Sequence, residues 1–386
     1  MSSAVPEGWQ VSPLGSLATV NWGNLSLTKD SYVETGFPAY SAAGNDGLVP
    51  NAEHTAVGVV LSAIGARCGR TFLTPQRWTA IKNTITILSD NQDIRFLYQV
   101  FNFNEVWNKS GGAQPFISLG DARKTPILHP PLPEQKKIAS ILTSVDEVIE
   151  NTQKQIDKLQ DLKKATMNEL LTKGIGHTEF KDSELGRIPK SWEVRSLSEV
   201  SELSRGKFSH RPRNDPAFYD GDFPFLQTGD IPTDNLDIAY FSQSLNEKGL
   251  QVSRLFPKGT LVMTIAATVG EVAFLTFDSC FPDSLVGITA NESLVRQYFL
   301  LFCLRFRKQV LIQEAPESAQ KNLNLDILNP FQVAVPPLHE QRAIESTLLS
   351  IQKHIEKNKT KLSQTQSLKK SLMQDLLTGK VRVTVN

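Results

Sequence analysis

Two stretches of the sequence hold several basic residues and no acidic residue, a composition that suits contacts with phosphate groups. The first stretch contains Arg67, Arg70, Arg77 and Lys82. The second contains Arg205, Lys207, Arg211 and Arg213, with His210 among them. Because either cluster alone also fits an ordinary solvated surface, the pair indicates nucleic-acid binding only together with other features of the chain.

Polar side chains near these stretches could bind the edges of DNA bases, since amide and hydroxyl groups read base edges in the major groove. They are Tyr40, Ser41 and Asn45 in the first half of the chain and Gln227, Thr228 and Asp230 in the second. Turn formation is the competing explanation, because Gly44-Asn45-Asp46-Gly47 and Thr228-Gly229-Asp230 both have the composition of turns.

Residue patterns for catalysis are not found in the sequence. Asn329-Pro330-Phe331 lacks the second proline of an amino-methyltransferase motif. Pro282-Asp283 is followed by Glu292-Ser293-Leu294, without the lysine of a nuclease motif. The six histidines show no metal-ligand spacing, and no phosphate-binding Gly-x-x-x-x-Gly-Lys loop is present. We therefore expect no catalytic residue, no metal site and no cofactor in this chain.

The elements that would position these side chains come in two copies. Residues 130–172 and 336–378 align without a gap at a constant offset of 206, and both begin Pro-Pro-Leu-x-Glu-Gln. A second motif, Pro-x-x-Trp, occurs at Pro6 and at Pro189, near the start of each half. Such a duplication predicts two similar halves that meet a two-part target.

Within each copy, apolar residues repeat at alternating spacings of four and three, which is typical of a helix that pairs with another helix. In the first copy the apolar positions are Ile138, Leu142, Val145, Ile149, Ile156 and Leu159. In the second they are Ile344, Leu348, Ile351, Ile355 and Leu362. We call the helix face formed by these positions the seam, and it also holds the polar residues Thr152, Asn358 and Thr365. The alternative is that each helix lies along its own domain.

A globular block between the two helices favours antiparallel pairing, which would give the chain a pseudo-two-fold axis and two separated heads. The blocks contain β-rich runs at 58–64, 84–88, 260–265 and 272–277 and short helical patterns at 93–101 and 294–311. The predicted class is α+β, with two α+β domains separated by an antiparallel two-helix coiled coil.

Bulk composition limits the function classes only loosely. The formal charge is +1, so any nucleic-acid surface must be local. Three cysteines, far apart in the sequence, favour a reducing compartment over a disulfide framework. We see no signal peptide and no apolar run long enough to span a membrane, and we expect a cytoplasmic location.

The chain resembles the specificity subunit of type I restriction–modification systems. The resemblance covers nearly the full chain and depends on three features. They are Ala113-Gln114 and Ala319-Gln320, each followed by Pro-Pro-Leu-x-Glu-Gln, the linker from Gly176 to Pro189, and the ending from Leu376 to Val383. On this basis residues 1–129 and 189–335 are predicted target-recognition domains, 130–175 and 336–386 long-helix segments, and 176–188 a linker.

The resemblance also implies partners. Each target-recognition domain would read one half of a bipartite site in double-stranded DNA, while the paired helices set the gap and dock two methyltransferase subunits. S-adenosylmethionine would belong to those subunits, and ATP with Mg²⁺ to two restriction subunits where they are present. The recognised bases cannot be carried over, because the recognition residues differ between members.

Two other classes of function stay open at this point. One is a self-contained DNA methyltransferase or nuclease with unrecognised motifs, which cofactor cross-linking to the isolated chain would reveal. The other is a coiled-coil interaction scaffold without a DNA role, which a large affinity ratio between one bipartite sequence and random DNA would exclude.

Overall fold

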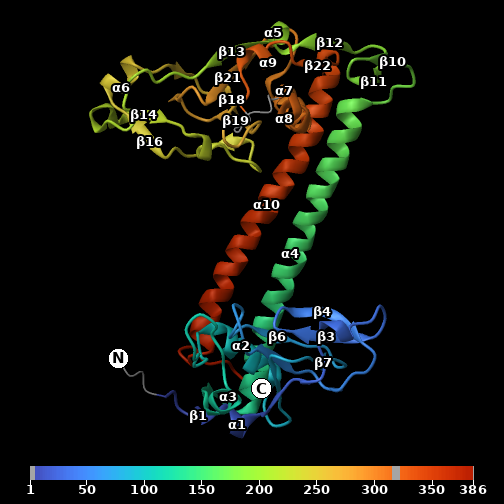
Figure 1. Cartoon of the computed structure of the whole chain (residues 1–386), viewed down its shortest axis with the longest axis vertical. Coiled ribbons are helices and arrows are strands. Elements are labelled where there is room, and N and C mark those ends of the chain that lie inside the picture. Colours follow the sequence, from blue (N-terminus) through green and yellow to red (C-terminus); the bar gives the residue numbers. More distant parts are fainter. Residues whose placement is uncertain (1–4, 315–321, 386) are drawn as a thin grey trace. The chain divides into compact units, whose positions relative to one another are not determined.

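The computed structural model describes residues 5–314 and 322–385 (Figure 1). The chain forms two compact units. The first holds the described residues up to Gln155 and those from Asn358 onward, and the second holds Ile156–Lys357. Ala319-Gln320, one of the repeated motifs, lies outside the described residues.

The first unit is an α+β domain, and its elements follow the chain. They are β1 (Gln10–Pro13), α1 (Leu14–Leu17), β2 (Thr19–Trp22), η1 (Lys29–Ser31), β3 (Phe37–Ser41), β4 (Gly44–Val49), β5 (Val59–Ser62), β6 (Thr71–Leu73), β7 (Thr79–Ala80), β8 (Thr84–Leu88), α2 (Ile94–Phe103), α3 (Leu119–Lys124) and β9 (Pro126–His129). The strands form a four-stranded sheet, β2-β8-β5-β6, a three-stranded sheet, β4-β3-β7, and the pair β1-β9.

The second unit has the same order of elements with additions. They are β10 (Phe180–Ser183), β11 (Gly186–Pro189), β12 (Glu193–Ser196), α5 (Leu197–Val200), β13 (Ser201–Arg205), η2 (Pro216–Phe218), β14 (Tyr219–Phe225), η3 (Thr228–Asp230), β15 (Asp237–Ile238), β16 (Gln243–Leu245), α6 (Glu247–Gln251), β17 (Leu255–Phe256), β18 (Leu261–Thr264), β19 (Val272–Leu275), β20 (Ser279–Cys280), β21 (Leu285–Ala290), α7 (Gln297–Phe306), α8 (Lys308–Glu314), α9 (Leu325–Leu328) and β22 (Gln332–Val335).

The strand orders show that the two units share one topology. The larger sheet of the second unit, β13-β21-β18-β19-β15, repeats β2-β8-β5-β6 and adds one strand. Its smaller sheet, β16-β14-β20-β17, repeats β4-β3-β7 and adds another, and β12-β22 repeats β1-β9. The predicted internal repeat is therefore a repeat of the fold, although the sequences of the two domains differ widely.

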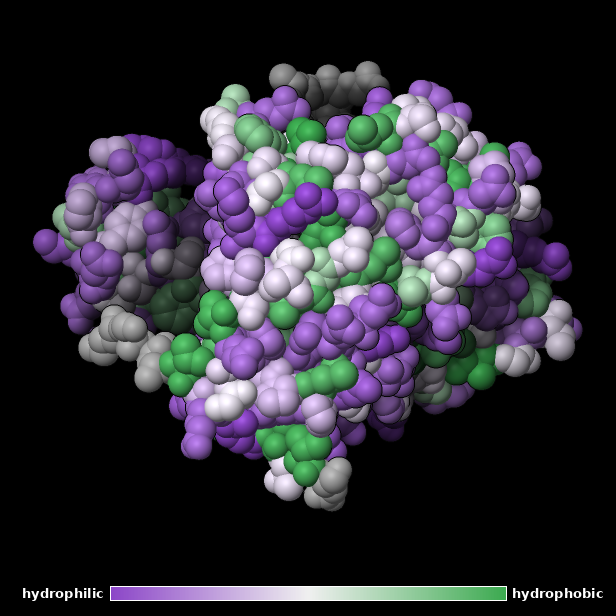
Figure 2. Space-filling model, turned by 90° about the horizontal axis from the view of Figure 1, so that it is seen from below, coloured by the Kyte–Doolittle hydropathy of each residue, from purple (hydrophilic) through white to green (hydrophobic). Residues whose placement is uncertain are grey.

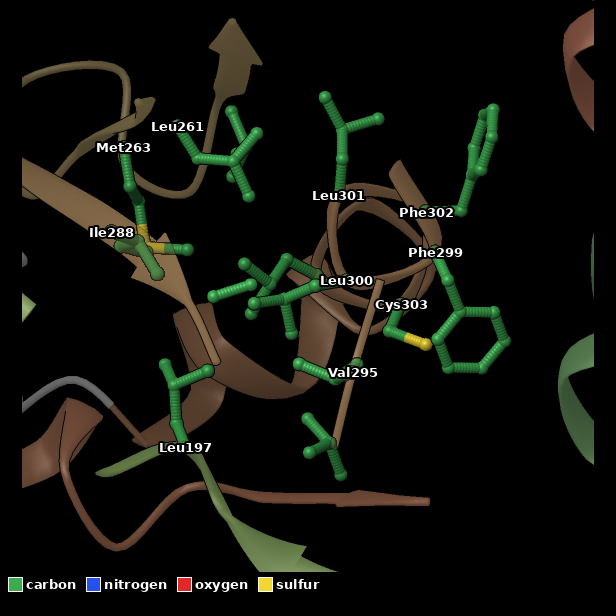
Figure 3. Close-up of a cluster of buried hydrophobic side chains, with 14 of the residues drawn as sticks. Leu197, Leu261, Met263, Ile288, Val295, Phe299, Leu300, Leu301, Phe302 and Cys303 are labelled. Atoms are coloured by element: carbon green, nitrogen blue, oxygen red, sulfur yellow. The ribbon is translucent and has the colours of Figure 1, made fainter. Parts of the chain in front are cut away.

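The core of each unit lies between a sheet and a helix that follows it. In the second unit, Leu300 of α7 points toward the sheet residues Leu261 and Ile288 (Figure 3). Phe299 and Phe302 point away from the sheet on the other side of α7, and all of these residues are buried in the same core. Outside the core, small hydrophobic areas are separated by hydrophilic residues on the face that Figure 2 shows. The helical pattern predicted for 294–311 is wrong in one respect, because two helices, α7 and α8, meet at Arg307.

The long helices α4 (Leu132–Thr172) and α10 (Leu338–Leu376) each contribute to both units. In the first unit, Ile138 and Leu142 from the beginning of α4 share a core with Met373 and Leu376 from the end of α10. In the second unit the ends are exchanged, since Leu171 near the end of α4 shares a core with Ile344 and other residues at the start of α10. This exchange confirms the predicted antiparallel pairing.

Polar contacts between the helices agree with this direction. Lys369 forms an ion pair of 2.6 Å with Asp146 in the first unit, and the Lys163 Nζ donates to the Gln352 Oε1 at 2.7 Å in the second. All predicted seam positions are buried or partly buried, including the polar Thr152, which is 2% exposed. Its hydroxyl donates to the main-chain oxygen of Val148, which satisfies the hydroxyl group inside its own helix.

The repeated Gln of Pro-Pro-Leu-x-Glu-Gln joins each long helix to its domain. Gln135 and Gln341 are fully buried. The side-chain oxygen of Gln135 accepts from the main-chain N–H of Asp93, the residue that caps α2, and that of Gln341 accepts from the main-chain N–H of Arg296, which precedes α7. The same hydrogen bond forms in both units, which explains why both copies of the motif have glutamine at this position.

Candidate nucleic-acid interface

Each unit has a cavity at an equivalent place in its topology. Cavity 1, in the first unit, has a volume of about 570 Å³. Its lining is Thr28, Lys29, Asp30, Ser41, Ala42, Ala43, Ile64, Ala66, Arg67, Ile81, Lys82 and Asn83. Cavity 2, in the second unit, has a volume of about 300 Å³. Its lining is Phe208, Arg213, Asn214, Tyr219, Phe225, Gln227, Gln243 and Pro282.

The correspondence between the cavities follows from strand pairing. In the smaller sheets, Tyr40 of β3 pairs in parallel with Ala80 of β7, and Phe225 of β14 pairs in parallel with Cys280 of β20. Each cavity is lined by residues just beyond the end of β3 or β14 and by residues that follow β7 or β20. Two domains with unlike sequences therefore present a cavity built from equivalent segments.

Cavity 1 gathers basic residues that the sequence separates. Arg67, in the loop after β5, and Lys82, between β7 and β8, are both exposed and line the same cavity. Within the described part of the chain, neither forms an ion pair. Their charges are therefore available to an anionic ligand such as a phosphate backbone.

A carboxylate organises one wall of cavity 1. Asp46 accepts hydrogen bonds from the Tyr32 hydroxyl at 2.6 Å and the Ser41 hydroxyl at 2.7 Å, and it forms an ion pair of 2.5 Å with Lys29. Burial raises the pKa of Asp46, but these three partners outweigh it and hold the pKa below its ordinary value. The aspartate is thus ionised and fixes the orientation of Lys29 and Ser41 at the cavity.

Arg70 and Arg77 are exposed but lie outside the lining of cavity 1. The guanidinium of Arg77 lies over the ring of Phe37, with its Cζ 4.1 Å from the ring centroid. Asn45 is exposed as expected, yet Gly44-Asn45-Asp46-Gly47 is part of strand β4, and the turn is formed by Ala42-Ala43.

Two predicted base-contacting residues of the first unit are buried. Tyr40 is 5% exposed and packs with Val60 and Trp78, and burial raises the pKa of its hydroxyl. Ser41 is 4% exposed, and its hydroxyl is engaged by Asp46. Tyr40 is therefore part of the core of this unit, and Ser41 contributes to the cavity wall with its hydroxyl bonded to Asp46.

Cavity 2 brings together Arg213 and Gln227, two of the predicted residues. Arg213 forms an ion pair of 2.7 Å with Asp283, whose main-chain oxygen also accepts from the Arg205 Nε at 2.6 Å. Pro282-Asp283, considered above as an incomplete nuclease motif, therefore orients basic side chains.

The other basic residues of this stretch lie outside the lining of cavity 2. Lys207 and Arg211 are exposed. The guanidinium of Arg211 donates to the main-chain oxygens of Phe208 and His210, both at 2.7 Å.

Asp230 is buried and bonded within the protein. It is 5% exposed, and its carboxylate accepts from the main-chain N–H of Gln227 at 2.8 Å and from the Ser242 hydroxyl at 2.8 Å. Thr228 and Asp230 belong to the short helix η3 (Thr228–Asp230), so the expected turn-like conformation is present. Hydrogen bonds inside the protein therefore engage the Asp230 carboxylate.

Sequence reasoning missed Gln243, which also lines cavity 2. The Gln227 Nε2 donates to the Gln243 Oε1 at 2.9 Å. Gln243 is the cross-strand partner of Phe225, just as Asn45 is the partner of Tyr40. Both domains thus place an exposed carboxamide at the equivalent sheet position. No local signal marks Gln243, because only the pairing of β14 with β16 brings it to the cavity.

Features that would support catalysis are not found in the described residues. In this part of the chain, no group of three or more His, Cys, Asp and Glu side chains could hold a metal ion. Phe331 of Asn329-Pro330-Phe331 is 3% exposed and lies under the guanidinium of Arg307. Among the helices that the structure describes, none combines the length and the apolar character needed to cross a membrane.

A duplicated α+β domain with an equivalent cavity in each copy, joined to paired long helices, defines the class of two-domain recognition proteins. A family model described as the type I restriction modification DNA specificity domain matches residues 6–161 and again residues 189–365, which is more than half of the chain. The chain therefore belongs to the family of type I restriction–modification specificity subunits.

Individual relatives agree with this membership. The chain is 32% identical over 281 residues to the putative type I restriction enzyme MjaX specificity subunit of Methanocaldococcus jannaschii, over 70% of this chain and 64% of that relative. It is 28% identical over 415 residues to the MjaVIII specificity subunit of the same organism, over 98% of this chain and 94% of the relative. The crystal structure of a type I system S subunit from M. genitalium shares the fold, with a TM-score of 0.69 and 15% identity over 97% of this chain and 98% of that one.

Proposed function

We propose that this chain is the DNA-recognition and scaffold subunit of a type I restriction–modification complex and has no catalytic activity of its own. The observation that carries the proposal is the pair of equivalent cavities with basic and carboxamide side chains, one in each copy of a domain that the family model matches twice. Each domain would bind one half of a bipartite site in double-stranded DNA. Because the two linings differ, the two half-sites would differ too.

Within this proposal the chemistry belongs to partners. Two methyltransferase subunits would dock on the long helices and supply S-adenosylmethionine, and ATP with Mg²⁺ would act in restriction subunits where these join the complex. The seam residues described above would keep the helices paired so that the partners and the two domains act on one DNA site. The complex would work in the cytoplasm, where it meets chromosomal DNA.

Long-read methylation sequencing of the host genome, with and without this gene, tests the proposal. If the chain determines specificity, deletion removes one gapped motif that carries methyladenine on both strands. An unchanged methylome in a host that expresses the methyltransferase partner would refute the proposal.

A double substitution, Ile149→Lys with Ile355→Lys, is expected to abolish or broaden the preference for one spacer length. Ile355 is 3% exposed and Ile149 is partly buried, so a charge at either position opposes helix pairing. Selection from duplexes with variable spacers measures the effect. The same change at the exposed Ser140 and Thr347 serves as a control, and an intact spacer preference in the isoleucine variant would contradict the role of the helices as a ruler.

A further inference from the structure

We propose that Gln227 and Gln243 together read one adenine in the half-site bound by the second domain. This inference depends on the proposed function and names the base that cavity 2 recognises.

The two glutamines form a fixed pair at one wall of cavity 2. Gln243 opens strand β16 and pairs with Phe225, while Gln227 lies two residues beyond Phe225 in the sequence. The Gln227 Nε2 donates to the Gln243 Oε1 at 2.9 Å. Gln243 is exposed and Gln227 is partly buried, so both side chains can reach a ligand in the cavity.

The internal hydrogen bond determines what the pair offers to DNA. It uses one N–H of Gln227 and one lone pair of the Gln243 oxygen, so the Gln227 oxygen still offers an acceptor and the Gln243 NH₂ still offers a donor. If both amides were turned over, the bond would run in the opposite direction, and the pair would still offer one acceptor and one donor. The pattern does not depend on how the amide groups are oriented.

Adenine matches this pattern in the major groove. Its edge presents the N6 amino group, which donates, beside N7, which accepts, whereas guanine presents two acceptors, cytosine a donor and thymine an acceptor with a methyl group. Among single bases, adenine alone can therefore form two hydrogen bonds with one acceptor and one donor.

Asp230 is the positioning residue of this pair. Its carboxylate accepts from the main-chain N–H of Gln227 at 2.8 Å and from Ser242, the residue before Gln243, through the N–H at 3.3 Å and the hydroxyl at 2.8 Å. A single buried group thus fixes the backbone at both glutamines. Arg213 and Asn214 lie in the lining of the same cavity, where they can contact the DNA backbone next to the base.

The first domain offers an independent parallel. Asn45 of β4 is the cross-strand partner of Tyr40, and Gln243 of β16 is the cross-strand partner of Phe225. Tyr40 pairs in parallel with β7, and Phe225 pairs in parallel with β20. Asn45 and Gln243 therefore occupy equivalent positions in the two smaller sheets. Both side chains are exposed carboxamides. The same scaffold position carries a side chain suited to base reading in both domains, although their sequences differ.

Selection of DNA from a library of random duplexes by the purified full-length chain tests the inference. The unmodified chain should select a gapped motif with an adenine in one half. In Gln243→Glu the new carboxylate can only accept, so the pair presents two acceptors and suits the amino group of cytosine. We expect the ratio of A·T to C·G at that base pair to fall roughly tenfold or more, with the other half-site unchanged.

A second variant and a matched control make the result decisive. Gln227→Glu should alter the same base pair, and Gln251→Glu, the same change at an exposed position of α6, should leave the motif intact. The inference is overturned if Gln243→Glu selects the original motif, if it weakens all positions equally, or if the two variants alter different base pairs. If the unmodified chain selects no gapped motif, the proposed function fails, and the inference fails with it.

Discussion

Replacement of both Arg67 and Lys82 by alanine will weaken DNA binding about 30-fold at roughly 0.15 M salt. Both side chains line cavity 1, both are exposed, and neither is paired with an acidic group in the described chain. Each phosphate contact contributes about 0.9 to the slope of log K against log salt, so the slope should become shallower by about 1.8. Fluorescence anisotropy over a salt series measures the affinity and the slope together.

A matched variant separates cavity contacts from net charge. Arg95→Ala with Lys124→Ala removes the same two charges from exposed positions of the same unit, on α2 and α3, away from the lining of cavity 1. We expect its slope to stay close to that of the unmodified chain. If both double variants lower the slope equally, the effect comes from overall charge, and cavity 1 is not where DNA binds.

Glu340→Ala is expected to lower the free energy of unfolding of the second unit by about 2–4 kcal/mol. The Glu340 carboxylate, 6% exposed, accepts from the Trp192 Nε1 at 3.0 Å, the Ile175 N–H at 2.9 Å and the His177 Nε2 at 2.8 Å. Trp192 is fully buried, so its indole N–H would lose the one acceptor that the described residues give it, without access to water. A buried donor without a partner costs free energy because water can no longer satisfy it.

Hydrogen exchange with mass spectrometry suits this measurement, because the chain has two units and a single melting temperature would combine them. Amides of β12 and the start of α10 should exchange roughly 30-fold faster or more, as the loss of stability implies. Glu179→Ala is the control, since Glu179 forms a pair with Lys190 in which the side chains are 73% and 69% exposed. Such exposed pairs contribute about 1 kcal/mol or less. Equal exchange in the two variants would show that Glu340 does not anchor this unit.

The same glutamate has different partners in the two copies of the motif. Glu134, equivalent to Glu340, receives two hydrogen bonds at 2.8 Å from the guanidinium of Arg382. In the second unit, the donors to Glu340 include Ile175 and His177, which lie in the segment after α4. In the first unit, the donor to Glu134 is Arg382, which lies in the segment after α10. Each long helix therefore begins beside the segment that follows the other long helix.

Close packing at this point also explains a glycine. Gly174 has φ +67°, and a Cβ there would lie 2.4 Å from the Glu340 Oε1 and 2.8 Å from the Trp192 ring. A side chain at this position would displace the carboxylate from its donors. The sequence shows Gly174 only as a residue that follows a helix, whereas the structure shows which contact excludes every other residue.

Much of the architecture could be predicted from the sequence because it depends on short-range periodicity and on a repeat. The four-three spacing from Ile138 to Leu159 identifies a helix that pairs, since that spacing places every apolar residue on one side. The constant offset of 206 shows that the second half repeats the first, and the globular block between the helices favours an antiparallel arrangement. These are properties of the chain that need no knowledge of distant contacts.

The composition of the two cavities was decided by tertiary structure alone. Tyr40 has the chemistry of a base-contacting residue, but it lies in a part of β3 where Ala39, Tyr40 and Ser41 are all buried, and the sequence does not show that both faces of this strand are covered. Gln243 meets Gln227 only because β14 pairs with β16. Asp283 orients Arg213 across 70 residues of sequence. Periodicity in the sequence is enough to reveal the helices, because it depends on residues that are near one another in the chain. The residues that line each cavity are far apart in the chain and meet only through the pairing of strands, so only the folded chain shows them.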